Sequence, residues 1–121
     1  MDSRRQTAKT FRDLIVWQKA HELVLAIYQK TQAFPKDEVY ALSSQIRRSS
    51  MSVAANIAEG FKKTSARDKA RIYNIAQGSL SETEYFLLLS QDLKYGDMKE
   101  LILKADEVGR ILGSYIKAVK G

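Results

Sequence analysis

Cysteine is absent from this chain of 121 residues, and histidine, tryptophan and proline each occur only once. Without thiols the protein can form neither a disulfide nor a thiolate metal site, which fits a reducing cytosol. No apolar run approaches the ~20 residues of a membrane span, and the basic N-terminus precedes no apolar segment with a cleavage site. We therefore expect a soluble, cytoplasmic protein with no membrane partner.

The single histidine leaves little material for catalysis. Di-iron chemistry in helical bundles requires two Glu-x-x-His pairs, which one histidine cannot supply. Helical ribonucleases that pair arginine with histidine would need a partner for His21, and the nearest upstream arginine, Arg12, is nine residues away. No glycine motif that cradles phosphate is present. The sequence thus predicts no catalytic residue, no metal site and no cofactor, and His21 is expected to pack or to form hydrogen bonds.

Helical periodicity dominates the sequence, and no strand pattern competes with it. Four stretches, at about residues 13–33, 35–60, 65–93 and 97–119, carry apolar residues at spacings of three and four. The junctions are short, so consecutive helices should be antiparallel neighbours of matching length. The predicted fold class is an all-α, antiparallel up-down-up-down four-helix bundle over residues 12–121, preceded by a basic, flexible tail over residues 1–11.

Each helix has a predicted core face. The stripe of the first helix comprises Trp17, Ala20, Val24, Ile27, Tyr28 and Thr31, and it leaves Val16 and Leu23 outside. The stripes of the other three comprise Val39, Leu42, Ile46, Ser50, Val53 and Ile57; Ile72, Tyr73, Ala76, Leu80, Thr83 and Leu87; and Leu101, Ala105, Val108, Leu112, Tyr115 and Val119. These faces should meet in one core.

Helix ends are marked by residues with special backbone preferences. Pro35 should end the first helix and begin the second, whose first turn would contain Glu38. Gly60 is expected to end the second helix in a left-handed conformation, and Gly96 to end the third. Ser65 with Asp68 resembles a capping box at the start of the third helix. Gly78, inside that helix, is expected to allow close helix packing.

The second helix is apolar nearly all round. Its back, which should face water in a lone bundle, carries Met51, Ala54, Ala55 and Ala58. A second apolar face implies a neighbouring subunit. The first and third helices also hold apolar residues outside their stripes. The predicted interface between copies is formed by Ile15, Met51, Ala55, Ala58, Tyr85 and Leu88. Exposed alanines that merely favour helix formation are the alternative interpretation of the alanine positions.

The formal net charge of +6 is unevenly distributed. Residues 1–12 carry +3, residues 62–71 carry +4, and the rest of the chain sums to −1. Such patches suit a polyanion, although a basic tail and loop can also serve only solubility. The predicted nucleic-acid-binding residues, which would contact phosphates without reading bases, are Arg47, Arg48, Lys62, Lys63, Arg67, Lys69 and Arg71. Phe61 and Tyr73 are the aromatic residues that flank this patch.

A polar cluster lines one flank of the second helix. Gln45, Ser49, Ser52 and Asn56 share this flank, with Arg48 and Glu59 just beyond. Buried polar groups commonly satisfy one another and fix the register of packed helices, so we expect Asn56, Gln45 and Glu59 to satisfy each other, and we favour that role over a ligand pocket. Arg47 and Arg48 point in different directions at 100° per residue, which predicts that one pairs internally and the other reaches solvent.

Several short motifs of this sequence occur at the same spacing in a known family. They are Leu14, Trp17 and Ala20; Phe34-Pro35 with Glu38; Gln45-Ile46-Arg47-Arg48; Asn56-Ile57-Ala58-Glu59-Gly60; and Gly78-Ser79-Leu80 with Glu82. From about Phe11 to the C-terminus the chain resembles the four-helix-bundle proteins encoded in intervening sequences of bacterial 23S rRNA genes. The accessory proteins of diversity-generating retroelements are similar. The resemblance implies a homopentamer of bundles that forms a basic barrel and, for the retroelement relatives, binding of nucleic acid and of a reverse transcriptase.

Two functions of different kinds follow. The first is a non-enzymatic, homo-oligomeric scaffold that binds RNA or DNA through its basic patches with little sequence preference. The alternative is an adaptor bundle that docks a protein partner, such as a polymerase-type protein, with the basic loop incidental. An enzyme is the least favoured class, because its activity would have to depend on His21.

Overall fold

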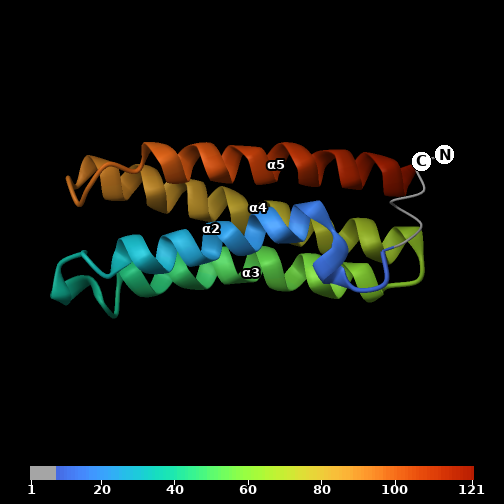
Figure 1. The fold of residues 1–121 in the computed structure, drawn as a ribbon, viewed down its shortest axis with the longest axis horizontal. Coiled ribbons are helices and arrows are strands. Elements are labelled where there is room, and N and C mark those ends of the chain that lie inside the picture. The colour runs from blue at the N-terminus through green and yellow to red at the C-terminus, as the bar shows by residue number, and fades with distance from the viewer. Residues whose placement is uncertain (1–7) are drawn as a thin grey trace.

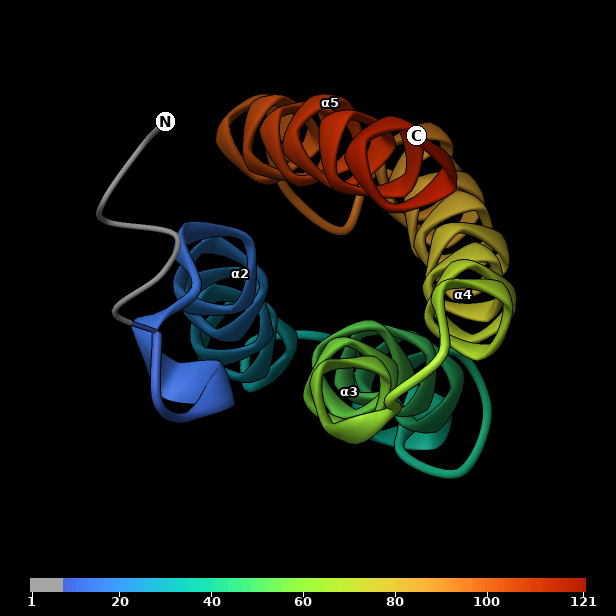
Figure 2. The same cartoon turned by 90° about the vertical axis from the view of Figure 1, so that its right-hand side faces the viewer.

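A computed structural model describes residues 8–121 (Figure 1). It contains the α-helices α2 (Ile15–Thr31), α3 (Leu42–Lys62), α4 (Ala66–Asp92) and α5 (Lys99–Lys120), and the 3-10 turns η1 (Phe11–Asp13) and η2 (Lys36–Glu38). Consecutive helices run antiparallel, and α2 packs against both α3 and α5, so the four helices form a square in cross-section (Figure 2). Residues 8–121 contain no strand. The predicted all-α, up-down-up-down bundle is confirmed.

The start of the bundle lies within the predicted tail. Residues 1–7 of that tail lie outside the described residues. The Thr10 hydroxyl accepts a hydrogen bond from the Arg12 backbone N–H, and Asp13 accepts one from the Thr10 N–H, which closes a capping box around η1. The ring of Phe11 packs edge-on against Trp17 at 5.0 Å between centroids. The packed chain therefore extends at least to Thr10.

The helices differ in length, contrary to the prediction that they match. They contain 17, 21, 27 and 22 residues in chain order. The shortest is α2, because Leu14 is extended (φ −79°, ψ 126°) and separates α2 from η1. As a consequence, the last turns of α5 extend past the start of α2 and are only half-buried, as at Tyr115 and Val119.

The core faces of α3, α4 and α5 lie largely as predicted, but that of α2 does not. In α2 the fully buried residues include Val16 and Leu23, both at 0% exposure, which were predicted to lie outside the core. Trp17, Val24 and Tyr28, which were predicted inside, are half-buried on the flank. The helix is thus rotated by roughly 50° from the expected orientation, at 100° per residue, because Trp17 and Tyr28 find partners beside the core instead of within it.

The connection between α2 and α3 replaces the expected first turn of the second helix. After the single turn of η2 the backbone breaks at Ala41 (φ −122°, ψ −104°), and α3 begins only at Leu42. The Glu38 carboxylate accepts hydrogen bonds from the Leu42 backbone N–H at 3.3 Å and from the Tyr95 hydroxyl at 2.7 Å. Val39, a predicted core residue, lies in this connection and is exposed.

Two glycine predictions were wrong. Gly60 does not end its helix, which continues to Lys62, and it is buried beneath the ring of Tyr73. A Cβ atom at Gly60 would lie 2.5 Å from Tyr73 Cε1, so this position requires glycine for close approach and not for a left-handed turn. Gly78, expected to permit close packing, is exposed and has nothing within 4 Å of its Cβ direction.

The polar flank of α3 forms a hydrogen-bonded seam with α4. The Thr83 hydroxyl lies 2.8 Å from Ser49 Oγ, and the Ser52 and Ser79 hydroxyls lie 2.8 Å apart. Asn56 donates to the Ser52 carbonyl oxygen at 2.8 Å. The prediction that Asn56, Gln45 and Glu59 satisfy each other was wrong, because Gln45 and Glu59 are exposed and Asn56 bonds to Ser52 instead. These small polar residues let α3 and α4 approach closely, which supports the predicted structural role over a ligand pocket.

The remaining helix ends follow the predicted chemistry. Ser65 caps α4 by accepting a hydrogen bond from the Asp68 backbone N–H at 3.1 Å. The end of α4 is the exception: the helix ends at Asp92, before Gly96, and Lys94 takes the left-handed conformation (φ +64°), while Gly96 has φ +143° in the connection that follows, a conformation that side chains strongly disfavour. Asp97 accepts a hydrogen bond from the Lys99 N–H at 2.9 Å as α5 begins. Both junctions therefore hold consecutive helices antiparallel.

Candidate nucleic-acid interface

One end of the bundle gathers basic residues from four segments. The C-terminal end of α3, the start of α4, the end of α5 and the first described residues all lie there (Figure 1). We call it the basic end. It carries three carboxylates, Asp13, Glu59 and Asp68, against nine cations: Lys9, Arg12, Lys62, Lys63, Arg67, Lys69, Arg71, Lys117 and Lys120. The ion pairs within residues 8–121 involve Lys19 and Arg110 and none of these nine.

A shallow pocket of about 550 Å³ lies at the basic end, between the first turns of α4 and the last turn of α5. Arg67, Arg71, Asn74 and Lys120 line it, together with the small residues Ala66 and Ala70. The N-terminus of α4 adds the partial positive charge of its unpaired N–H groups. Lys120 was missed by sequence reasoning, because only the return of α5 along α4 brings it beside Arg67 and Arg71.

Lys69, a predicted binding residue, is held within the fold. Its ammonium group donates hydrogen bonds to the carbonyl oxygens of Gly60 at 3.0 Å and of Phe61 at 2.7 Å, and lies 5.4 Å from the centre of the Phe61 ring. Burial lowers the pKa of Lys69. The side chain thus caps the C-terminus of α3, where carbonyl groups lack helical partners.

Arg47 and Arg48 lie far from the basic end. They are about 20 Å from Lys62 along α3, at 1.5 Å per residue. Arg47 Nε donates to the Thr31 hydroxyl at 2.8 Å, and the guanidinium group lies 4.6 Å from the centre of the Tyr28 ring. Arg48 is exposed. One arginine therefore pairs internally while the other reaches solvent, as their angular separation predicts.

The residues of the predicted interface lie on the surface of three helices. Four large apolar side chains are exposed: Ile15 by 56%, Met51 by 43%, Tyr85 by 58% and Leu88 by 51%. Ala55 is also exposed, whereas Ala58 is half-buried. The sequence reasoning did not single out three further apolar residues with similar exposure, Ile75, Leu93 and Leu103.

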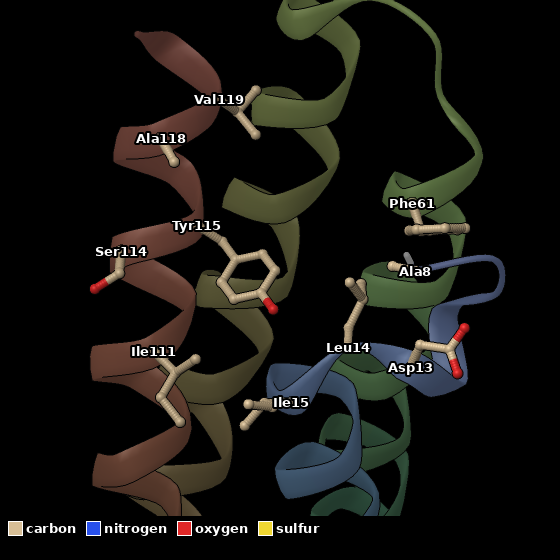
Figure 3. A pocket seen from close by; sticks show the side chains of 10 residues that line it. All are labelled: Ala8, Asp13, Leu14, Ile15, Phe61, Ile111, Ser114, Tyr115, Ala118 and Val119. Atoms are coloured by element: carbon tan, nitrogen blue, oxygen red, sulfur yellow. The ribbon is translucent and has the colours of Figure 1, made fainter. Parts of the chain in front are cut away.

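An apolar groove of about 610 Å³ opens beside the basic end, where the last turns of α5 extend past α2 (Figure 3). The Tyr115 ring projects from α5 across the groove towards Leu14 and Phe61 (Figure 3). The full lining is Ala8, Asp13, Leu14, Ile15, Phe61, Ile111, Ser114, Tyr115, Ala118 and Val119. Sequence reasoning missed this groove because it assumed helices of equal length, which would have covered Tyr115 and Val119.

The described residues offer few groups for chemistry at these surfaces. Within residues 8–121 no three histidine or carboxylate side chains are close enough to hold a metal ion together. None of the helices in this range combines the length and apolar character needed to cross a bilayer. What the basic end provides is positive charge, a shallow pocket and an apolar groove, and these features suit binding of an anionic ligand.

Fold and surface together define an all-α four-helix bundle with one strongly basic end. The family model of the 23S rRNA-intervening sequence proteins matches residues 12–114. The chain belongs to this family, which confirms the resemblance inferred from its motifs.

The chain is also similar to a solved structure. It is the 1.70 Å crystal structure of a protein with unknown function from the S23 ribosomal protein family of Bacteroides thetaiotaomicron VPI-5482, with 29% sequence identity and a TM-score of 0.76. The similarity covers 85% of this chain and 99% of that one. A comparison with curated proteins gives no match.

Proposed function

We propose that this protein is a non-enzymatic, homo-oligomeric scaffold that binds RNA or DNA in the cytoplasm through its basic end. The observation that carries the proposal is the gathering of nine cations from four segments, none of which forms an ion pair within residues 8–121. Phosphate groups are the natural partners of such a surface. Within residues 8–121 no helix presents an evident set of base-reading side chains, so binding should depend little on sequence.

Within this proposal the cations have different roles. Arg67, Arg71 and Lys120 surround the shallow pocket and would contact phosphates directly, with Lys62 and Lys63 beside them at the end of α3. Lys69 and Arg47 instead stabilise helix ends through their hydrogen bonds to backbone and side-chain oxygens. Arg48, exposed on α3, would add a separate contact.

A salt series tests the proposal. Replacing Arg67, Arg71 and Lys120 together with glutamine should weaken binding to a duplex DNA of mixed sequence and reduce the slope of log K against log salt by about one per lost phosphate contact. Fluorescence anisotropy measures both quantities. Lys69→Met serves as the matched control. It removes one charge from the same end, but it should leave the slope unchanged, because the Lys69 ammonium group already bonds to two carbonyl oxygens. A slope near zero for the wild type, or no binding at low salt, rejects the proposal.

Self-association is the second part of the proposal. The exposed side chains of Met51, Tyr85 and Leu88 resemble residues that copies of a chain bury against one another. The family resemblance sets the expected number of copies at five. A ring would repeat the basic end around its axis, and avidity would then raise weak phosphate binding by orders of magnitude.

Light scattering coupled to size-exclusion chromatography measures the assembly. The wild-type protein should elute at several times the monomer mass of 13.7 kDa, and Met51→Asp with Leu88→Asp should shift it to the monomer, because buried carboxylates would oppose the contact. Asp substitutions at Gln29 and Gln32, exposed polar residues of the α2 end, provide the control. A folded wild-type monomer across the concentration range contradicts this part of the proposal.

The alternative function is an adaptor that docks a protein partner. The apolar groove beside Tyr115 is the observation that favours it, because a groove lined by apolar side chains suits a partner's apolar residue. In that case the glutamine substitutions at the basic end would leave partner binding intact. Loss of binding to the protein partner only when Met51 or Leu88 is substituted would likewise indicate the adaptor.

A further inference from the structure

Three aromatic side chains contact one another in succession beside the basic end, and the last two of them are stacked. Phe11 meets Trp17 edge-on, at 5.0 Å between centroids and 66° between planes. His21, one helical turn after Trp17, lies nearly parallel to the indole at 4.8 Å and 9°. The Gln18 side chain donates a 2.8 Å hydrogen bond to the Arg12 carbonyl oxygen, which ties η1 to α2. We call this stack of Phe11, Trp17 and His21 the aromatic platform.

The platform ends in an exposed residue, His21. Phe11 and Trp17 are half-buried, whereas His21 is exposed. One face of the imidazole ring lies against Trp17, so the opposite face is directed away from the stack. The indole fixes the orientation of this ring, and a planar group could therefore stack on His21 with little further ordering of the side chain. The structural role expected for His21 accounts for its contact with Trp17 but not for the outward face.

Positive charge borders the platform. The Arg12 guanidinium group lies 5.9 Å from the centre of the Phe11 ring. Lys62 follows Met51 by eleven residues, or about three helical turns, so both occupy the same side of α3. Met51 contacts Tyr28 of α2, and η1 packs against both α2 and α3. Lys62 therefore lies at the end of the exposed outer side of α3 that carries Met51, near η1.

The carboxylates on η1 and α2, Asp13 and Glu22, already have partners, whereas Glu59, three residues before Lys62 on α3, is exposed. Asp13 accepts hydrogen bonds from the backbone N–H groups of Lys9 at 2.8 Å and Thr10 at 3.0 Å, and these bonds lower its pKa. Glu22 lies 3.9 Å from the Lys19 ammonium group. An exposed aromatic face bordered by cations has the chemistry of a single-stranded nucleic-acid surface, in which bases stack and phosphates meet positive charge.

We infer that the protein prefers single-stranded RNA or DNA, with an unpaired base stacked on His21 and its flanking phosphates contacted by Arg12 and Lys62. Trp17 and Phe11 support the stacked ring from behind. This inference rests on the proposed function and narrows its ligand, because the bases of an intact duplex are already stacked on each other and cannot occupy the platform. Stacking is tolerant of sequence, in agreement with the lack of base-reading side chains.

Trp17 provides the probe, because it is the only tryptophan. Titration with an oligouridylate of about twelve nucleotides, a length within the usual site size, should change the Trp17 emission until it saturates. The same strand annealed to its complement should bind more weakly. His21→Ala should weaken binding of the single strand at least about fivefold, the loss typical of one base–aromatic stack. His21→Phe should retain it, since the phenyl ring also stacks, and Gln29→Ala on α2 is the control.

The outcomes separate the platform from the basic end. If His21→Ala binds like the wild type while the Arg67, Arg71 and Lys120 substitutions still weaken binding, the platform is refuted and the proposed function stands. If the protein binds neither the single strand nor the duplex, both the aromatic platform and the proposed function are refuted. If the Trp17 emission shifts to shorter wavelength with rising protein concentration and no oligonucleotide, the platform is an interface between copies, and the inference is overturned. Unchanged circular dichroism of the His21 variants would show that the fold is intact.

Discussion

Replacing Gly60 with alanine should lower the free energy of unfolding by about 1–3 kcal/mol, even though alanine is the better helix former. The added Cβ would lie 2.5 Å from Cε1 and 2.7 Å from Cδ1 of Tyr73. Tyr73 is only 3% exposed, and its ring also meets Tyr115 at 6.5 Å, so it has little room to withdraw. The substitution must therefore push α3 and α4 apart where their close approach matters most. Thermal unfolding would register this as a drop of roughly 3–6 °C for each kcal/mol.

Gly78→Ala is the matched control and should have the opposite sign. Gly78 also lies inside a helix, but nothing approaches its Cβ direction within 4 Å. Alanine there should raise the free energy of unfolding by up to about 1 kcal/mol through helix propensity alone. If both substitutions stabilise the protein equally, Tyr73 does not press on Gly60, and the close contact between α3 and α4 at this point is disproved.

The predictable part of the fold is the part determined by local periodicity. The apolar stripe of α4, the helix cap at Ser65 and the turn at Gly96 could be recognised from the sequence. Spacing and backbone preference act within a few residues, so they are visible locally. Gly60 could not be interpreted in the same way. A glycine followed by lysines is typical of a helix end, and only the position of Tyr73, on the next helix, shows that its role is close packing.

The candidate site, too, could be predicted from the sequence only where its residues are close together in the chain. Lys62, Lys63, Arg67 and Arg71 could be predicted as one patch because they are close in the sequence. Lys120 joins them only through the return of α5, and Lys69 is occupied by two carbonyl oxygens that no charge count reveals. Sequence reasoning finds the charge of a surface, whereas the hydrogen bonds decide which charges remain available to a ligand.

Tertiary contacts also determine which aromatic side chains are available at the surface, and this could not be read from the sequence. Phe61 and Tyr73 flank the basic residues in the sequence, yet Tyr73 is buried under α3 and Phe61 lies beneath the Lys69 ammonium group. The rings that reach the surface as a stack are those of Phe11, Trp17 and His21. The spacing of four between Trp17 and His21 was the available signal, since such pairs share one face of a helix.

Leu23→Ala should be the most destabilising of the substitutions considered, because it empties a position at 0% exposure in the middle of α2. Removing a fully buried leucine side chain and leaving a cavity costs about 2–5 kcal/mol. Leu25→Ala, two residues along the same helix, should change the free energy of unfolding by no more than about 0.5 kcal/mol, because Leu25 is 57% exposed.

Urea unfolding at one fixed protein concentration measures both effects, since self-association would otherwise add a concentration-dependent term. The Leu23 variant should unfold at a much lower urea concentration with an unchanged slope, and the Leu25 variant should follow the wild type. If the Leu23 variant instead followed the wild type, α2 would face the core as its sequence stripe predicts, with Trp17 and Tyr28 inside and both Leu23 and Leu25 outside. In that case Trp17 could not support an exposed ring at His21, so the orientation of α2 and the aromatic platform depend on the same measurement.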